Sequence, residues 1–313
     1  MSDESQKEGK LAPGRDKEPA SYSAESTRRP DVLGTQIEAG ISFQTTDNEA
    51  PWWHALDPHG TQMAHIICSI DPLCRLFISR LAEPKRSEAF ADSVAKAIHW
   101  AVDQNVDIIS LGHVVYTEPG SVTAKKIKTA VQRARDHDIV ILSSSDQQAR
   151  GAWDIFRIPH IRHEIFTIAP CNHSGELAKW YKSPWYNYCF VDNVDFDGAL
   201  FLGSSQVVSG SSVSTAIATG VISLILVFCR LANENNFEPD DKWRTSITKT
   251  KLDAMCDGEG TAADDRFVVL DNICGGKKLE DVDFMTEVRN SFRYQRPRPA
   301  YSESGEEDDT WNE

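Results

Sequence analysis

A histidine and a cluster of serines, each at the start of an apolar stretch, are the residues with the clearest capacity for chemistry. His59 opens the run HGTQMA directly after a loop. Histidine titrates close to neutral pH, so a histidine at the start of a helix suits a general base. A lone histidine is more often structural, and His59 by itself is therefore only a candidate.

The serine cluster, Ser209 to Ser214, lies immediately before the apolar run Thr215–Leu231. We expect that run to be a helix, which would place a serine beside free backbone N–H groups that favour negative charge and can stabilise an oxyanion. A serine hydroxyl becomes a good nucleophile when an imidazole accepts its proton. The alternative is that these serines and glycines only form a turn and cap the helix.

Taken together, the runs HGTxMA and GSSxSTA resemble the histidine and serine signatures of the subtilisin family of serine peptidases. The resemblance extends from about residue 40 to residue 231 and includes the segments AIHWAV, residues 97–102, and VDIISLG, residues 106–112. It implies a three-layer α/β fold with a mostly parallel central sheet. It also implies a serine endopeptidase, whose substrate or ligand is a polypeptide.

The resemblance carries site roles over to particular positions of this chain. His59 matches the general base and Ser212 the nucleophile. Ser110, Leu111 and Gly112 match the backbone segment that pairs with an extended peptide, which is recognition by β-augmentation. In this chemistry an acidic third group orients the imidazole, so full activity needs three residues.

The expected acidic residue is absent from its place in the sequence. The family carries it at the end of an apolar strand ahead of the histidine, whereas the aspartates before His59 follow no β-branched run: Asp3, Asp16, Asp31, Asp47 and Asp57. In subtilisin, loss of the aspartate alone lowers turnover by roughly four orders of magnitude. Three interpretations stay open: a weak peptidase, an inactive peptide-binding protein, or a fragment lacking a central strand that does not fold stably.

Two further positions depart from the family pattern. Asp146 stands where the family usually has an asparagine that donates to the oxyanion, and a carboxylate donates only when it is protonated. Loss of that donor typically lowers the rate by roughly 10²–10³-fold. His113 stands where the strand often continues with a second glycine, and it either narrows the cleft or lies beside it.

Strands and helices alternate along the middle of the chain, which predicts an α/β domain with a parallel sheet. We expect helices over residues 88–104 and 121–135, and strands over residues 73–81, 106–111, 139–142, 164–169 and 266–270. Residues 1–30 contain no Val, Ile or Phe and are expected to be a disordered tail. The peptidase domain is expected over residues 31–282, incomplete at its start, and an acidic disordered tail over residues 283–313.

Composition bounds the remaining possibilities. The formal net charge of −14 argues against nucleic-acid binding, which needs clustered Lys and Arg. The run Thr215–Leu231 is shorter than the roughly 20 residues that span a bilayer, so we expect a buried core helix and no membrane association. The start of the chain has no secretory signal, which predicts an intracellular, cytoplasmic protein.

Cysteine and ligand patterns add little chemistry. The seven cysteines are scattered without a C-x-x-C pair, and we expect reduced, mostly buried thiols. We assign no metal site and no cofactor. Calcium is an expectation by resemblance only, because the family often binds it and the sequence offers no complete ligand set.

Overall fold

The computed structural model of the chain describes most of the sequence between residues 32 and 292. All of the described residues belong to the compact unit Val32–Glu313. The described ranges are 32–43, 51–54, 57–82, 87–113, 115–118, 120–144, 165–181, 186–196, 206–233, 242–256, 266–269, 272 and 284–292.

The largest sheet in the described part has four parallel strands in the order β3-β4-β5-β6. These strands are β3 (Ile108–Leu111), β4 (Val140–Ser144), β5 (Phe166–Cys171) and β6 (Tyr188–Val191). A separate parallel pair consists of β1 (Ile37–Ser42) and β2 (Leu76–Arg80). An antiparallel hairpin consists of β7 (Asn193–Phe196) and β8 (Gln206–Ser209).

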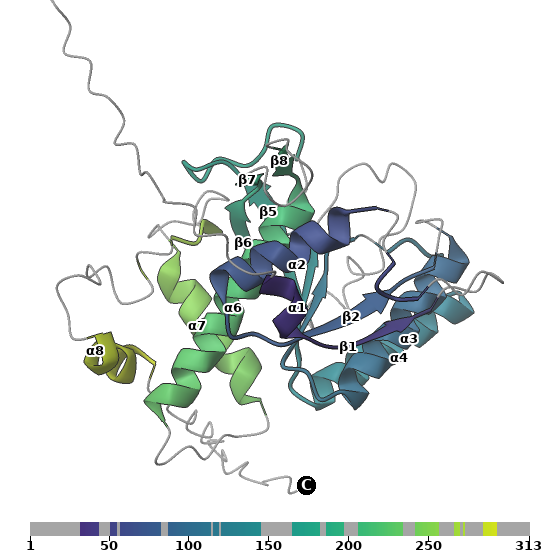
Figure 1. The fold of residues 1–313 in the computed structure, drawn as a ribbon, viewed down its shortest axis with the longest axis horizontal. Helices are drawn as coiled ribbons and strands as arrows, with labels where there is room; N and C mark the ends of the chain where they lie inside the picture. The colour runs from purple at the N-terminus through teal and green to yellow at the C-terminus, as the bar shows by residue number, and fades with distance from the viewer. Residues whose placement is uncertain are drawn as a thin grey trace, which may run out of the picture. The chain divides into compact units, whose positions relative to one another are not determined.

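Helices lie on both faces of the four-stranded sheet. The helices are α1 (Val32–Gln36), α2 (His59–Ile70), α3 (Glu88–Asp103), α4 (Val122–Asp136), α6 (Ser211–Ala232), α7 (Trp243–Met255) and α8 (Phe284–Ser291). On β4, Ile141 packs into the cluster formed with α3 and α4, whereas Val140 and Leu142 pack into the cluster formed with α6 and α7. Because successive strand side chains point to opposite faces, this alternation shows helices, sheet and helices in three layers. Figure 1 shows the elements in place.

Capping residues explain where two of these helices begin. The side chain of Ser87 accepts a hydrogen bond from the backbone N–H of Phe90 at the start of α3. Ser121 does the same for Ala124 at the start of α4. Each cap satisfies a backbone donor that the first helical turn leaves free. The predicted helices over residues 88–104 and 121–135 are confirmed to within one residue at each end.

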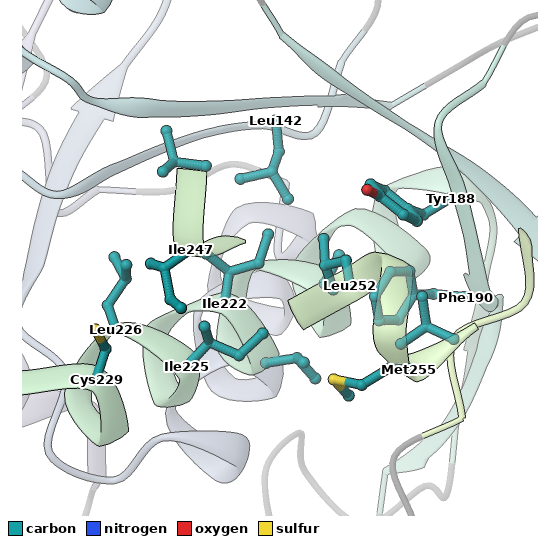
Figure 2. Packing of buried hydrophobic residues seen from close by; sticks show 14 of the residues in the cluster. Leu142, Tyr188, Phe190, Ile222, Ile225, Leu226, Cys229, Ile247, Leu252 and Met255 are labelled. Atoms are coloured by element: carbon teal, nitrogen blue, oxygen red, sulfur yellow. The ribbon is translucent and has the colours of Figure 1, made fainter. Parts of the chain in front are cut away.

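The apolar run near residue 220 forms the central helix α6, 22 residues in length. Among the described residues, α6 is the one helix long and apolar enough to cross a membrane, and here 67% of its apolar window is buried. Ile222, Ile225 and Leu226 pack beneath Leu142 and Tyr188 of the sheet, as Figure 2 shows. The expectation of a buried core helix is confirmed.

Several boundaries differ from the sequence-based expectations. The described part of the predicted strand 266–270, residues 266–269, is not a strand, because Phe267 and Val268 make only isolated bridges to Cys189 and Cys256. The core also continues past residue 282, since Val288 and Phe292 are completely buried in the α6–α7 cluster. The predicted strand 106–111 is shorter in the structure, where β3 spans Ile108–Leu111 and has one buried position, Ile109.

Candidate active site

The start of α6 is built around a glycine that an L-residue could not easily replace. Gly210 has φ +133°, a conformation that favours glycine. Its N–H donates to the carbonyl of Asp192 just after β6, at 2.8 Å. Its carbonyl in turn accepts from the backbone of Val213 and Ser214. This turn therefore ties the first residues of α6 to the carboxyl end of β6.

The serines of the cluster have different surroundings. Ser214 is fully buried, and its hydroxyl donates to the carbonyls of Phe190 and Val191 at 3.0 and 3.2 Å. Ser212 is half-buried, and no hydrogen bond of its hydroxyl to another described residue is present. Ser214 thus has the structural role, which leaves Ser212 with an uncommitted hydroxyl at the mouth of the helix.

Ser212 lies against the end of β3. Its Cβ is 3.7 Å from the position that a Cβ on Gly112 would take, which is ordinary van der Waals contact. Gly112 directly follows β3, which is the segment whose backbone was predicted to pair with a peptide. The structure therefore brings the predicted nucleophile and the predicted peptide-binding segment together.

His59 begins α2 on the same side of the molecule. Its backbone N–H donates to Oδ1 of Asp57 at 3.0 Å, which satisfies one of the free donors at the start of α2, where Pro58 is the N-cap residue. The imidazole of His59 lies beside that of His113, with ring centroids 5.5 Å apart and an angle of 37° between the planes. The His113 ring also meets the edge of Phe90 at 6.3 Å. His113 follows Gly112 directly, so the His59 ring, the end of β3 and Ser212 gather at one edge of the sheet.

Two close contacts hold α2 against α6. A Cβ on Gly220 would come within 2.8 Å of Cβ of Ile70, which means that the helices approach at the width of a glycine. Ser223 donates to Oδ2 of the buried Asp71 at 2.5 Å, just beyond the end of α2. The starts of the two helices, which carry His59 and Ser212, are therefore fixed relative to each other by packing further along both helices.

The strand β3 is also attached to α6. The hydroxyl of Thr219 donates to Oγ of Ser110 at 2.8 Å, and these residues are 109 positions apart in the sequence. Sequence reasoning did not identify Thr219, because no local pattern marks a threonine in an apolar helix as the partner of a distant strand. Its role is to position Ser110, Leu111 and Gly112 relative to the serine helix.

Some predicted features lie apart from this arrangement or outside the described residues. Asp146 lies outside the described residues, so its predicted oxyanion position stays a prediction. In the described part of the chain no hydrogen bond joins the side chains of His59 and Ser212. Within the same residues no group of three His, Cys, Asp or Glu side chains is placed to hold a metal ion. Calcium therefore stays an expectation by resemblance.

The arrangement of the site can be compared with known proteins. No family model matches the chain. A subtilisin-like protease het-Q2 of Podospora anserina is 27% identical over 181 residues, covering 54% of this chain and 49% of that protein. A thermostable alkaline protease of Halalkalibacterium halodurans is 24% identical over 200 residues, covering 61% of this chain and 52% of that protein. The chain thus spans about half the length of the curated relatives that it matches.

Solved protease structures share the fold. A prenylagaramide maturation protease, PagA, superposes with a TM-score of 0.54 at 15% identity, covering 85% of this chain and all of that one. A protease domain of PatA gives a TM-score of 0.57 at 17% identity over 78% of this chain and 88% of that one. A lanthipeptide protease gives 0.57 at 14% identity over 76% and 79% of the two chains. The predicted three-layer, mostly parallel architecture is confirmed by these likenesses.

Proposed function

We propose that this chain, which has the fold of subtilisin-like proteases and sequence similarity to them, is a serine endopeptidase. The observation that carries the proposal is the meeting of three separate segments at the end of β3. Ser212 lies against Gly112, and the His59 ring lies beside the ring of the next residue, His113. These segments are far apart in the sequence, and a purely structural helix cap does not require them to meet.

The proposed reaction follows from the positions of these groups. An extended peptide pairs with the backbone of Ser110, Leu111 and Gly112. The Ser212 hydroxyl attacks the carbonyl carbon of the peptide bond while His59 accepts the hydroxyl proton. His59 then gives that proton to the departing amine, and water releases the acyl group from the serine by the reverse sequence of proton transfers.

The start of α6 supplies a site for the negative charge of the intermediate. The first N–H groups of a helix have no partner within it, and the helix dipole favours an anion there. At α6 the N–H groups of Val213 and Ser214 donate to Gly210, which leaves those of Ser211 and Ser212 without a partner among the described residues. Ser212 belongs to this first turn. An oxyanion formed on its substrate would therefore lie close to these donors, which is the arrangement that stabilises acyl-transfer intermediates.

A fluorophosphonate probe tests the nucleophile directly, because it labels a serine whose hydroxyl is activated. We expect labelling of the purified chain and its loss in Ser212→Ala. Ser211→Ala is the matched control, since Ser211 is the preceding residue and is also half-buried. Labelling that survives in Ser212→Ala, or that disappears equally in Ser211→Ala, would overturn the assignment.

A second candidate is an inactive protein that keeps the fold and binds peptides. The observation in its favour is that the sequence has no apolar strand ending in aspartate ahead of His59. Absence of probe labelling in a folded chain that still binds extended peptides would select this candidate. Peptide turnover that requires His59 would exclude it.

The proposed substrate or ligand is a polypeptide and not a nucleic acid, which the net charge of −14 supports.

We also propose that the chain acts inside the cell and without membrane attachment. The described cysteines are free thiols, although Sγ of Cys68 and Cys74 lie 3.7 Å apart. Unbridged neighbouring thiols are typical of a reducing compartment. Retention of free thiols in protein purified under non-reducing conditions is the corresponding check.

A further inference from the structure

Two cysteine thiols lie in contact where α2 ends and the chain turns toward β2. Sγ of Cys68, on the last turn of α2, is 3.7 Å from Sγ of Cys74, which lies two residues before β2 begins. The two residues are six positions apart, and both thiols are free. The sulfurs of a disulfide are about 2.05 Å apart, so a modest displacement of one cysteine would allow a bond between them.

The two cysteines differ in how far they are exposed. Cys68 is only 1% exposed, in a cluster with Leu33 and Ala64 that holds it in place. Cys74 is half-buried, and the residue before it, Leu73, is 82% exposed. A small oxidant can therefore reach the pair from the side of the turn, and the exposed turn is the part that can shift when a bond forms.

The hydrogen bond between the two thiols favours ionisation of one of them. It lowers the pKa of Cys68, although burial and the nearby carboxylate of Asp71 act to raise that pKa. The same bond raises the pKa of Cys74, because the remaining proton is held between the two sulfurs. Since the thiolate is the form of cysteine that reacts with oxidants, the contact between the thiols also prepares them for oxidation.

We propose that Cys68 and Cys74 form an oxidation site that a hydroperoxide converts reversibly into a disulfide. The thiolate attacks one peroxide oxygen, the O–O bond breaks and hydroxide leaves, which gives a sulfenic acid. The second thiol then attacks that sulfur, the S–O bond breaks, and water leaves as the S–S bond forms. Overall the two thiols lose two electrons and two protons, and hydrogen peroxide becomes two molecules of water. Inside the cell, such disulfides are usually transient and redox-sensing.

The position of the pair connects it to the candidate active site, a connection that rests on the proposed function. Asp71 is buried between the two cysteines in the sequence. Its Oδ1 accepts from the N–H of Leu73 at 3.0 Å, and its Oδ2 accepts from Ser223 of α6 at 2.5 Å. A bridge draws Cys74 toward α2, which tightens the turn that carries these bonds and moves the end of α2 against α6. Because His59 begins α2, the bridge displaces the histidine relative to the serine, and a misplacement of about 1 Å can lower a rate by roughly 10²-fold.

Other cysteines of the chain provide internal comparisons. Cys171 and Cys189 are also hydrogen-bonded to each other, but both are completely buried, so an oxidant reaches them only if the sheet opens. Cys256 is half-buried, as Cys74 is, and its thiol donates to the carbonyl of Leu252 at 3.2 Å, which keeps the proton on its sulfur. The pair at the end of α2 combines a neighbouring thiol with access from solvent, and we expect it to react first.

The test uses the full chain, with hydrogen peroxide as the oxidant and peptide mass spectrometry as the measurement. Trypsin releases Cys68 and Cys74 in a single peptide that ends at Arg75 and holds no other cysteine. We expect this peptide to lose the mass of two hydrogen atoms about tenfold or more faster than the peptide with Cys256 is oxidised. Dithiothreitol should restore its mass, and the thiols should stay reduced in buffer without peroxide.

Each outcome either supports or overturns the oxidation site. Loss of two hydrogen atoms in the unchanged chain, abolished in both Cys74→Ser and Cys68→Ala, supports it. Addition of oxygen atoms to the peptide without loss of hydrogen, or a dimer linked through disulfides, overturns it. Oxidation no faster than that of Cys256 overturns it as well. If one variant fails to fold, the other variant and the unchanged chain still decide.

A second readout separates this inference from the proposed function. The rate of fluorophosphonate labelling is compared for the reduced, oxidised and re-reduced chain. We expect oxidation to slow labelling by about tenfold or more, and Cys74→Ser to label at the same rate with and without peroxide. If the bridge forms and labelling is unchanged, the oxidation site is upheld and its action on the active site is rejected. If no form of the chain is labelled, the proposed function fails, while the mass measurement still decides whether the disulfide forms.

Discussion

Neighbouring serines at the start of α6 differ in role because their side chains leave the helix in different directions. Ser214 turns inward to the carbonyls of Phe190 and Val191 and is fully buried. Ser212 turns toward Gly112 and keeps its hydroxyl uncommitted among the described residues. Ser212 is therefore the candidate nucleophile because of its position on the helix, since its neighbours are also serines. For the same reason Ser211→Ala is an informative control for Ser212→Ala.

Asp92 offers a prediction about pH at the scale of a single residue. Lys126 of α4 and Lys96 of α3 lie 2.5 and 2.8 Å from its carboxylate, and these hydrogen bonds lower the pKa of Asp92. A lowered pKa in the folded state adds stability above the unfolded pKa of about 3.9, and that stability is lost as the pH falls through the folded value. We expect Asp92→Asn to lower the free energy of unfolding by roughly 0.5–1 kcal/mol at pH 7.

Urea unfolding at pH 7 and at pH 3 measures this effect. The difference between Asp92→Asn and the unchanged chain should be smaller at pH 3, because the contribution of the carboxylate declines once the pH falls below the unfolded pKa toward the lowered folded value. Glu118→Gln is the control, because Glu118 is exposed and its side chain has no ion pair with a described residue. A deficit of equal size at both pH values would contradict the electrostatic explanation.

At the scale of elements, the crossing of α2 over α6 sets the geometry of the site. The helices touch where Gly220 meets Ile70, with room for a hydrogen atom but not for a methyl group. Since His59 and Ser212 begin these helices, a displacement at the crossing moves both side chains. The site thus depends on packing more than two helical turns away from the serine.

We expect Gly220→Ala to lower the free energy of unfolding by about 1–3 kcal/mol, because its Cβ would lie 2.8 Å from Cβ of Ile70. Gly60→Ala is the matched variant, since nothing lies within 4 Å of its Cβ position and alanine favours the helix. We expect that variant to be neutral or stabilising by up to about 1 kcal/mol. Urea denaturation of both variants tests the crossing, and equal losses in the two would argue against it.

At the scale of the whole molecule, the core is closed by a helix that follows the expected domain boundary. Phe292 is completely buried and meets the ring of Phe228 on α6 at 5.3 Å. Its carbonyl accepts from Nδ2 of Asn233 at the end of α6, at 3.1 Å. Lys251 of α7 donates to the carbonyl of Ser291. The segment after residue 282 therefore joins α6 and α7 into one cluster.

A pair of truncations tests this closure. A chain ending at residue 282 loses α8, and we expect it to be less stable by several kcal/mol, because removal of a buried phenylalanine side chain alone costs about 3–5 kcal/mol. A chain ending at Arg293 keeps α8 and should unfold at nearly the same temperature as the full chain. Thermal unfolding followed by circular dichroism makes the comparison. Equal melting temperatures for the two truncations would return residues 283–292 to the predicted tail.

The sequence by itself determined the helices α3, α4 and α6, the strands around them and the three-layer class. These features follow from local periodicity and from the alternation of strand and helix, which neighbouring residues encode. It also indicated His59 and Ser212, because the two motifs are short and contiguous.

Only the tertiary structure decided how these pieces meet. The contact of Ser212 with Gly112, the pairing of the His59 and His113 rings and the bond from Thr219 to Ser110 each join residues from different elements. No local pattern encodes such contacts, because they depend on how the helices cross and on the order of the strands in the sheets. The same holds for the placement of β2 and β3 in separate sheets among the described residues, because strand pairing depends on the whole fold.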